Sequence, residues 1–241
     1  IKKMIDKAFI DSHIDKLTDC VNKASKEIIN VYEGDDFGHI EKSDGSPLTI
    51  ADKNANQVIL DELKSISSDI SIISEETFAN NQLKNLDKTY WLVDPLDGTK
   101  EFINKTDEFT VNIALIDNKQ AIFGIVAAPV IGKVWYGSVF DKNITEEGSV
   151  DKIRIVMSKS HKSENDKAFL EFIDSKNFNY EIIEKGSSLK LCSLADNEAD
   201  IYPRFGLTSE WDIAAAHAVL SSFNGSVVKL SLIHISEPTR Q

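Results

Sequence analysis

The chain contains only two cysteines, Cys20 and Cys192, among its 241 residues. They form no C-x-x-C pair and no cluster with histidines, which argues against a zinc site built from thiolates and imidazoles. A reducing compartment is the simplest setting for so few thiols. We therefore expect a cytoplasmic protein, and a peripheral position on the inner membrane is the alternative.

Long apolar runs are also missing. No stretch approaches the roughly 20 apolar residues that a transmembrane helix needs, and no signal-peptide pattern opens the chain. We therefore expect no transmembrane segment. The sequence begins at Ile1 without a Met, so we expect the natural N-terminus to lie upstream.

Basic residues are scarce relative to acidic ones, with 27 Lys and Arg against 39 Asp and Glu and a formal net charge of -12. A protein that grips nucleic acid by neutralising phosphates needs a basic face. We therefore expect no nucleic acid polymer as a partner, and any bound phosphate needs metal ions or a few local cations. The composition, 41% hydrophobic and 27% charged, is that of an ordinary globular protein of one large domain or two modest ones.

A pair of acids follows an apolar stretch in the middle of the chain. Residues 90–93 predict a short buried strand, and Asp94-Pro95 and Asp97-Gly98 are turn dipeptides that predict its end. Asp94 and Asp97 would then share a strand end, where like charges repel unless a cation lies between them. The pattern indicates a site for a hard metal ion. An acidic surface turn without a ligand is the alternative that these residues alone leave open.

The first half of the chain predicts two helices before the central acids. Apolar residues recur at alternating steps of four and three over residues 10–31, which is one stripe of a long helix. Thr49 is suited to cap a second helix, because Asp52 falls three residues later in a capping-box arrangement. Asp52 is therefore explained by its helix alone, as a first-turn acid beside the positive helix end.

Strands flank the central acids on both sides. A short strand over residues 70–73 ends at Ser74-Glu75-Glu76, which is a second acidic pair just past a strand. After the centre, three apolar or alternating runs predict an antiparallel meander. They cover residues 109–116, 120–127 and 134–140.

A polar, acidic segment over residues 141–151 suggests a boundary between an N-terminal subdomain, 1–150, and a C-terminal subdomain, 151–230. The second half then alternates in a way that predicts βα units. The predicted strands cover residues 153–157, 180–183, 199–202 and 226–230, and the predicted helices cover residues 164–173, 187–194 and 211–220. Residues 231–241 fit nothing before them, and we expect this tail to be non-native sequence.

Two helix starts in the second half carry residues that can bind a ligand. Gly186-Ser187-Ser188 opens one helix, where free amides and hydroxyls can bind a phosphate, and Trp211-Asp212 opens another. Both are also ordinary helix caps. Together with the other acids at element ends, Asp212 completes a set of carboxylates that suits Mg²⁺ or Mn²⁺ better than zinc. The set consists of Asp52, Glu75, Asp94, Asp97 and Asp212.

Three motifs in this order carry a resemblance to a known group. They are Ser74-Glu75-Glu76, Asp94-Pro95-Leu96-Asp97-Gly98-Thr99, and Trp211-Asp212 before an Ala-rich helix. The sequence from about residue 42 to residue 230 resembles the magnesium-dependent, lithium-sensitive phosphatase superfamily that includes the inositol monophosphatases.

Within that superfamily the sequence is similar to the bacterial CysQ-type 3′(2′),5′-bisphosphate nucleotidases. Lys100-Glu101-Phe102 after Thr99 points to them and away from the simple inositol monophosphatases. The other matching pieces are Ser46 to Asp52, Ser158-Lys159-Ser160-His161, Gly186-Ser187-Ser188-Leu189-Lys190 and Tyr202-Pro203-Arg204-Phe205-Gly206.

The resemblance implies an α/β fold, an α+β layered sandwich of the inositol monophosphatase and fructose-1,6-bisphosphatase kind, with alternating α and β layers and two subdomains. It also implies a hydrolase of sulfur metabolism that converts 3′-phosphoadenosine 5′-phosphate to AMP and phosphate with a metal-activated water. Two or three Mg²⁺ ions would be the cofactors, Mn²⁺ a substitute and Li⁺ an inhibitor. The partner would be a small nucleotide bisphosphate, and the protein a monomer or homodimer.

The same resemblance implies roles for individual residues. The metal ligands would be Glu75, Asp94, Asp97, Asp212 and the carbonyl of Leu96. Asp52 and Thr99 would hold and deprotonate the attacking water, and Glu75 would also touch the metal-water site. Gly98 and Thr99 would hold the scissile phosphate. Gly186, Ser187, Ser188 and Lys190 would face the nucleotide, and Lys159, His161 and Arg204 would contact its second phosphate.

Two other functions stay open. An inositol monophosphatase or sugar-phosphate phosphatase on the same scaffold is the main alternative, and a non-catalytic metal-binding or RNA-interacting relic is another. A covalent dehalogenase-type phosphatase needs an Asp where this chain has Pro95, and an EF-hand needs alternating oxygens and a closing Glu that the loop lacks. The superfamily's last strands are not recognisable after Leu230, so we expect the second subdomain to be incomplete and less stable.

Overall fold

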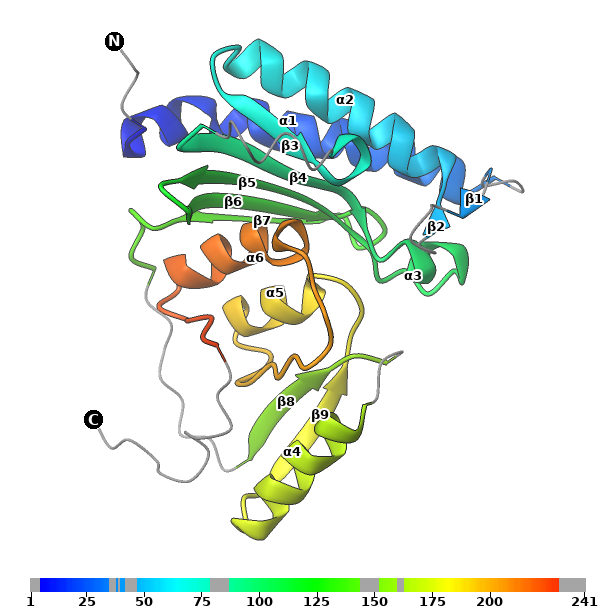
Figure 1. Cartoon of the computed structure of the whole chain (residues 1–241), viewed down its shortest axis with the longest axis vertical. Coiled ribbons are helices and arrows are strands. Elements are labelled where there is room, and N and C mark those ends of the chain that lie inside the picture. The colour runs from blue at the N-terminus through cyan, green and yellow to red at the C-terminus, as the bar shows by residue number, and fades with distance from the viewer. Residues whose placement is uncertain are drawn as a thin grey trace.

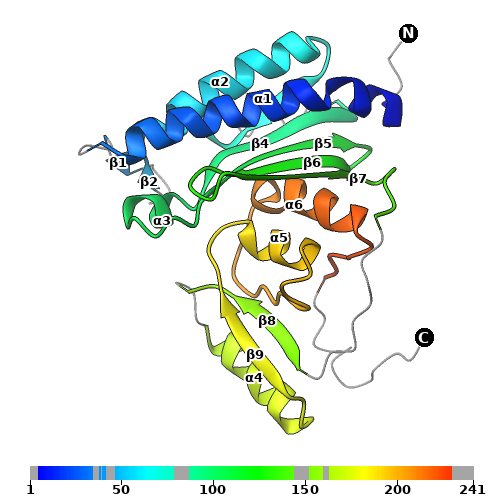
Figure 2. The same cartoon turned by 180° about the vertical axis from the view of Figure 1, so that it is seen from behind.

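Helices and strands alternate in layers. The computed structural model describes residues 5–34, 38, 40–41, 47–78, 87–143, 152–159 and 163–229. In Figures 1 and 2, α1 and α2 lie on one face of a five-stranded sheet, and α5 and α6 lie on its other face. The pair β8 and β9 follows below, with α4 outermost. This arrangement confirms the predicted α/β fold of alternating layers.

The two predicted N-terminal helices are present as α1 (Lys7–Tyr32) and α2 (Ile50–Ile66). The stripe on α1 is buried, as at Leu17, Val21, Ala24 and Ile28, and it packs over the sheet. The capping box at the start of α2 is confirmed, because Asp52 accepts hydrogen bonds from the amide and the hydroxyl of Thr49. Helical periodicity and local capping chemistry thus set both helices.

The central sheet has the strand order β3-β4-β5-β6-β7. β3 and β4 are parallel, and the remaining neighbours are antiparallel, which confirms the predicted meander. The strands are β3 (Ser71–Ser74), β4 (Thr89–Asp97), β5 (Thr110–Asp117), β6 (Gln120–Ala128) and β7 (Lys133–Ser138). The short elements around them are β1 (Ile40–Glu41), β2 (Pro47–Leu48), the 3₁₀ turn η1 (Glu75–Thr77) and α3 (Thr99–Ile103).

The prediction that the central strand ends before Asp94 is wrong. β4 continues to Asp97, and its pairing with β5 shifts register between Asp94 and Asp97. Pro95 falls inside this irregularity, where its missing N–H disrupts no regular ladder bond. The two acids are therefore held by strand geometry on both sides of a bulge rather than in a free turn.

In the second half, strands and helices alternate largely as predicted. The elements are β8 (Ile153–Met157), α4 (Glu164–Ser175), β9 (Tyr180–Glu184), α5 (Leu189–Ala195) and α6 (Glu210–Ser222). β8 and β9 pair in parallel, which confirms a βα unit with α4 as the connection. α6 packs against β5, β6 and β7, so a helix from the second half covers the sheet of the first. The division at residue 150 stays a prediction, since residues 144–151 lie outside the described residues.

Two predicted strands in this half are wrong. In 199–202 only Ile201 forms a bridge, to Ile155, and Pro203 follows, which cannot donate to a ladder. Residues 226–229 form no strand, because in the described ranges they have no neighbouring strand to pair with. Residue 230 and the tail 231–241 lie outside the described residues, so the predictions made for them stay predictions.

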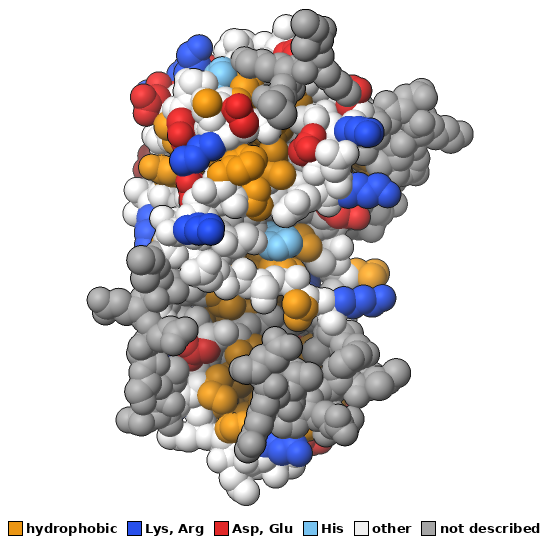
Figure 3. All heavy atoms as spheres, turned by 90° about the vertical axis from the view of Figure 1, so that its left-hand side faces the viewer, with side chains coloured by type: hydrophobic (Ala, Val, Ile, Leu, Met, Phe, Trp, Pro, Cys, Tyr) orange, Lys and Arg blue, Asp and Glu red, His pale blue; other side chains and the backbone are white. Residues whose placement is uncertain are grey.

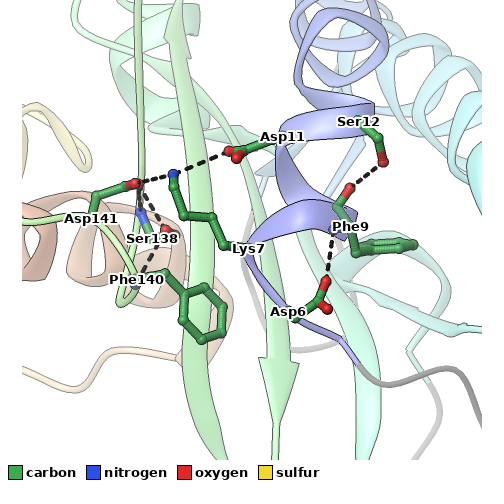
Figure 4. Close-up of polar contacts among 8 residues, drawn as sticks. All are labelled: Asp6, Lys7, Phe9, Asp11, Ser12, Ser138, Phe140 and Asp141. Carbon is green, nitrogen blue, oxygen red and sulfur yellow. Dashed lines mark hydrogen bonds and ion pairs between the residues drawn. The ribbon is translucent and has the colours of Figure 1, made fainter.

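The first turn of α1 is tied to the loop after β7, as Figure 4 shows. The Lys7 ammonium lies 3.1 Å from Asp11 and 2.7 Å from Asp141, and Asp141 in turn accepts hydrogen bonds from the amide and the hydroxyl of Ser138. Asp6 caps the helix by accepting from the amide of Phe9 at 2.9 Å. These contacts fix α1 at the end of the sheet that lies far from the central acids.

Figure 3 shows the face that lies to the left in Figure 1. Acidic and basic side chains are interspersed on it around a group of apolar ones. Within the ranges that the structure describes, no helix has the length and apolar character needed to cross a bilayer.

An aromatic cluster joins the end of α1 to α3 and β5. The rings of Tyr32, Phe102 and Phe109 lie with centroids 4.8 to 5.2 Å apart. The Tyr32 hydroxyl donates to Asp107 at 2.6 Å, and burial together with this bond raises the pKa of Tyr32 to about 12. Phe102 belongs to the Lys-Glu-Phe motif, so this motif residue has a packing role behind the central acids.

We expect Tyr32→Phe to lower the free energy of unfolding by about 1 kcal/mol, because the ring packing stays and one hydrogen bond to a carboxylate is lost. Urea unfolding monitored by circular dichroism measures the difference. Tyr136→Phe is the matched control, since Tyr136 is 54% exposed. An equal loss in both variants would contradict a specific role for the Tyr32 hydroxyl.

Candidate active site

The centre of the candidate site is Asp94, a carboxylate that is 2% exposed. Its Oδ1 accepts a hydrogen bond from the Leu96 amide at 3.0 Å, which closes the bulge in β4. Across the strand pair, Asp94 lies opposite Asn112 and Asp97 lies opposite Thr110. The two acids are thus paired with buried polar residues of β5.

Acids from the same strand and from two other elements act electrostatically on Asp94. Burial raises the pKa of Asp94 well above its ordinary value, and the charges of Asp97, Glu75 and Asp212 raise it further, in that order. Burial and then the charge of Asp212 raise the pKa of Asp97 to about 7, while Lys190 acts in the opposite direction. The fold therefore gathers carboxylates from β4, η1 and α6 whose negative charges destabilise one another.

Asp52 and Thr99 meet beside these acids. The Thr99 hydroxyl lies 3.3 Å from Oδ1 of Asp52 and 3.2 Å from the carbonyl oxygen of Leu96. Oδ2 of Asp52 is occupied by the cap of α2, where it accepts from the amide and the hydroxyl of Thr49. One oxygen of Asp52 therefore holds its helix and the other faces Thr99. The predicted pair is brought together by the start of α2 and the start of α3.

Gly98, which precedes α3, adopts a left-handed conformation with φ of 92°. A Cβ at this position would also lie 3.1 Å from the carbonyl oxygen of Glu108. Both the backbone conformation and the close approach require glycine here. The turn places the first amides of α3 beside the acids, where a phosphate oxygen could bind.

The turn over residues 186–188 docks onto β5 through a buried polar network. The hydroxyls of Ser188 and Thr110 lie 2.7 Å apart, and Ser188 donates to Oδ1 of Asn112 at 2.8 Å. The Ser188 amide also donates to Asp97, which lowers the pKa of that acid. The predicted nucleotide-binding turn is thus attached directly to the strands that carry the central acids.

Two side chains near this turn are poised for a ligand. The Ser187 hydroxyl is buried without a hydrogen-bond partner, and Ser187 has a φ of 43°. Lys190 is 4% exposed, and burial lowers its pKa while the charge of Asp97 opposes that shift. The Lys190 ammonium donates to the carbonyl oxygen of Lys185 at 3.5 Å. A buried hydroxyl without a partner and a buried ammonium group three residues later suit an anionic ligand with hydrogen-bond acceptors.

The cations predicted for a second phosphate lie further out. The Lys159 ammonium pairs with Glu108 at 2.8 Å, and Arg204 donates to the carbonyl oxygen of Leu207 at 2.8 Å. The charge of Arg204 also acts on Lys190, so the two lie near one another. His161 lies outside the described residues, and its role stays a prediction.

Comparison with known proteins decides the family. The model of the inositol monophosphatase family matches residues 12–233. The chain belongs to the inositol monophosphatase family. The family predicted from the Ser74, Asp94 and Trp211 motifs is therefore confirmed, and its members are metal-dependent phosphatases.

Two relatives place the chain within this family, and a more distant structure shares its fold. It is 39% identical over 224 residues, 89% of each chain, to the protein named 3′(2′),5′-bisphosphate nucleotidase CysQ of Shigella flexneri. The crystal structure of CysQ from Bacteroides thetaiotaomicron has a TM-score of 0.76 at 33% identity, with 88% of this chain and 87% of that one covered. The extragenic suppressor protein suhB of Bartonella henselae, at 18% identity and 88% and 84% coverage, has a TM-score of 0.72 and shows the shared fold.

The acids fit the metal-dependent chemistry of the inositol monophosphatase family by donor type and by charge. Buried oxygen donors that repel one another are stabilised by a divalent cation among them. In the part of the chain that the structure describes, no three His, Cys, Asp or Glu side chains already form a closed metal-binding set. Glu75 instead shares a hydrogen bond with Asp94, which is one way for two buried acids to limit their repulsion. The metal ligand set therefore stays a prediction.

Sequence reasoning missed several polar residues that build this site. Asn56 accepts from the hydroxyl of Ser74 at 2.6 Å and so ties α2 to the end of β3, directly before Glu75. Thr110 and Asn112 anchor the turn over residues 186–188, as described above. A signal was present, because Glu108, Thr110 and Asn112 alternate with large apolar residues at the start of a strand that is buried over almost its whole length.

We expect Asp94→Asn to stabilise the metal-free protein by about 1–2 kcal/mol at neutral pH. The raised pKa of Asp94 means that the folded protein without a cation either keeps this carboxylate ionised among like charges or binds a proton at a cost, and an amide requires neither. Thermal unfolding in the presence of a chelator measures this. Adding Mg²⁺ should then raise the melting temperature of the unmodified protein more than that of the variant. Asp15→Asn on the exposed face of α1 is the control, and a variant less stable than the metal-free parent would contradict the repulsion.

Proposed function

We propose that this protein is a 3′(2′),5′-bisphosphate nucleotidase that hydrolyses 3′-phosphoadenosine 5′-phosphate to AMP and inorganic phosphate. The observation that carries the proposal is the buried acid group around Asp94 beside the Asp52–Thr99 pair, in a chain that is 39% identical to a CysQ nucleotidase over 89% of its length. The acids supply metal-dependent phosphatase chemistry, and the relatives supply the substrate class. The enzyme is thus a phosphoric monoester hydrolase.

The carboxylates of Glu75, Asp94, Asp97 and Asp212, with the carbonyl oxygen of Leu96, would hold the metal. Hard oxygen donors favour Mg²⁺, with two or three ions in the site and Mn²⁺ as a substitute. When bound, Mg²⁺ lowers the pKa of a water and neutralises charge on the phosphoryl oxygens and the leaving alkoxide. The high pKa values of Asp94 and Asp97 belong to the protein without a cation, and a nearby positive charge lowers them.

Asp52 and Thr99 activate the attacking water. The Thr99 hydroxyl points its proton toward Oδ1 of Asp52 or the Leu96 carbonyl, which leaves its oxygen lone pairs to accept a hydrogen bond from the water. As the water attacks phosphorus, its proton passes through Thr99 to Asp52. Because Oδ2 of Asp52 is held by the cap of α2, the carboxylate keeps its orientation during this step.

The chain divides substrate binding between two sides of the acid group. The amides at Gly98 and Thr99 hold the scissile phosphate at the start of α3. Lys190 and the turn over residues 186–188 face the nucleotide, and the unpartnered Ser187 hydroxyl gains a partner when the ligand binds. Lys159, Arg204 and His161 contribute positive charge or donors to the second phosphate at the rim.

The cellular location and the oligomeric state of the protein are predicted from its sequence. A cytoplasmic enzyme fits the two buried free cysteines, Cys20 and Cys192, and the acidic composition. The peripheral inner-membrane position and the choice between monomer and homodimer stay predictions.

In a phosphate-release panel with Mg²⁺, we expect kcat/KM for 3′-phosphoadenosine 5′-phosphate to exceed that for inositol 1-phosphate and fructose 1,6-bisphosphate by about tenfold or more. A chelator should abolish release, and Li⁺ should inhibit it. A preference for inositol 1-phosphate would instead support the inositol monophosphatase alternative. No phosphate release from any of these substrates would support the non-catalytic alternative.

We expect Asp52→Asn to lower kcat by about 100-fold or more, because an amide can hold Thr99 but cannot accept the proton of the water. Asp166→Asn is the matched control, since Asp166 occupies the same capping-box position at the start of α4. Steady-state kinetics and thermal unfolding should show a similar change in stability for both variants and a loss of turnover in Asp52→Asn alone. Equal turnover in the two variants would exclude Asp52 as the proton acceptor.

A further inference from the structure

Glu108 lies in the connection between α3 and β5 and joins two segments from the second half of the chain. Its Oε2 accepts a hydrogen bond from the Gly186 amide at 3.0 Å, and its Oε1 pairs with the Lys159 ammonium at 2.8 Å. The Glu108 side chain is 19% exposed, so both contacts are partly shielded from water. One carboxylate thus contacts both the turn that faces the nucleotide and a cation at the rim.

The backbone of Glu108 also lies close to two glycines of the site, Gly98 and Gly186. A Cβ at Gly186 would lie 2.9 Å from the carbonyl oxygen of Glu108, and a Cβ at Gly98 would lie 3.1 Å from the same atom. The loop at Gly98 and the turn over residues 186–188 therefore both pack against the carbonyl oxygen of Glu108. A shift of Glu108 would move the two parts of the site relative to one another.

The turn over residues 186–188 is attached to β5 and to the residue that lies two positions before it. Glu108 holds Gly186, while Thr110 and Asn112 hold Ser188. Between these two attachment points lies Ser187, whose left-handed φ of 43° is unfavourable for a residue with a Cβ. Such a conformation persists only when its surroundings fix it on both sides. The Glu108 carboxylate supplies one of the two attachments.

The charge of Glu108 also matters for an anionic substrate. Paired with Lys159, the carboxylate limits the freedom of that ammonium group and keeps it near the turn. The negative charges of Glu108 and Glu101 also act on Lys190 and support its protonated form. Glu108 thus pairs with one predicted substrate-binding cation, Lys159, and favours the charged form of another, Lys190.

We propose that Glu108 is a positioning residue for substrate binding, which holds the turn over residues 186–188 and the Lys159 ammonium in the geometry that receives a nucleotide bisphosphate. The proposal rests on the nucleotidase function proposed above. The Glu108 carboxylate contacts the turn over residues 186–188 and Lys159, whereas Asp52 and Thr99 carry the proton of the water. Glu108 therefore acts on affinity for the substrate rather than on the chemical step.

The test compares steady-state kinetics of variants with 3′-phosphoadenosine 5′-phosphate. Glu108→Ala removes both contacts and should raise KM about tenfold while kcat stays within about twofold. Glu108→Gln keeps an acceptor for the Gly186 amide, and Lys159→Met removes only the ion pair, so each should raise KM by less. Glu171→Ala, on the exposed surface of α4, is the matched control and should leave both constants unchanged.

A purely structural role for Glu108 predicts a different pattern, because partial unfolding lowers the active fraction and hence kcat while KM stays constant. That pattern, or an unchanged KM in Glu108→Ala, overturns the proposal. If the unmodified protein does not hydrolyse the bisphosphate, the proposed function fails. Calorimetric binding of 3′-phosphoadenosine 5′-phosphate to the parent and to Glu108→Ala then tests Glu108 by itself, and equal affinities overturn its positioning role.

Discussion

The repulsion among buried carboxylates around Asp94 is the constraint on which the rest of the structure depends. Asp94 is buried, and Asp97, Glu75 and Asp212 lie close enough to act on it, so that burial first and like charge second raise the pKa values of Asp94 and Asp97. Such an arrangement costs stability and persists only in a rigid frame. The frame is the central sheet, where β4 is covered on one face by α1 and α2 and on the other by α5 and α6.

Two of the acids show how the fold offsets this cost locally. Asp52 and Asp212 occupy the same position in the capping boxes that open α2 and α6. In each, one oxygen accepts the hydrogen bonds of the cap, through Thr49 for Asp52 and through Thr208 and Ser209 for Asp212. The positive helix end stabilises the charge, and the other oxygen of Asp52 faces Thr99. Helix capping and site construction therefore use the same side chains.

The parts of the fold that follow from short-range rules could be predicted from the sequence. Residues close together in the sequence determine the apolar stripe of α1, the capping box at Thr49 and the antiparallel meander over residues 109–140. The acids at element ends also form a recognisable pattern. The bulge that carries β4 through Asp94 to Asp97 could not be predicted from such patterns, because it depends on pairing with β5. Likewise, Glu108 matters through its contact with Gly186, which is 78 residues away, and no local pattern indicates that partner.

The packing of α6 has a consequence for how the protein is made. Its buried face consists largely of alanines, such as Ala214, Ala215 and Ala218, so the helix lies close against β5 and β6. Asp212 at its start joins acids that precede it by more than a hundred residues in the chain. A growing chain on the ribosome can therefore build the sheet early, but its acid group remains incomplete until α6 emerges and docks. Asp212, the last of the predicted metal ligands, thus reaches the others only when the two halves of the chain have come together.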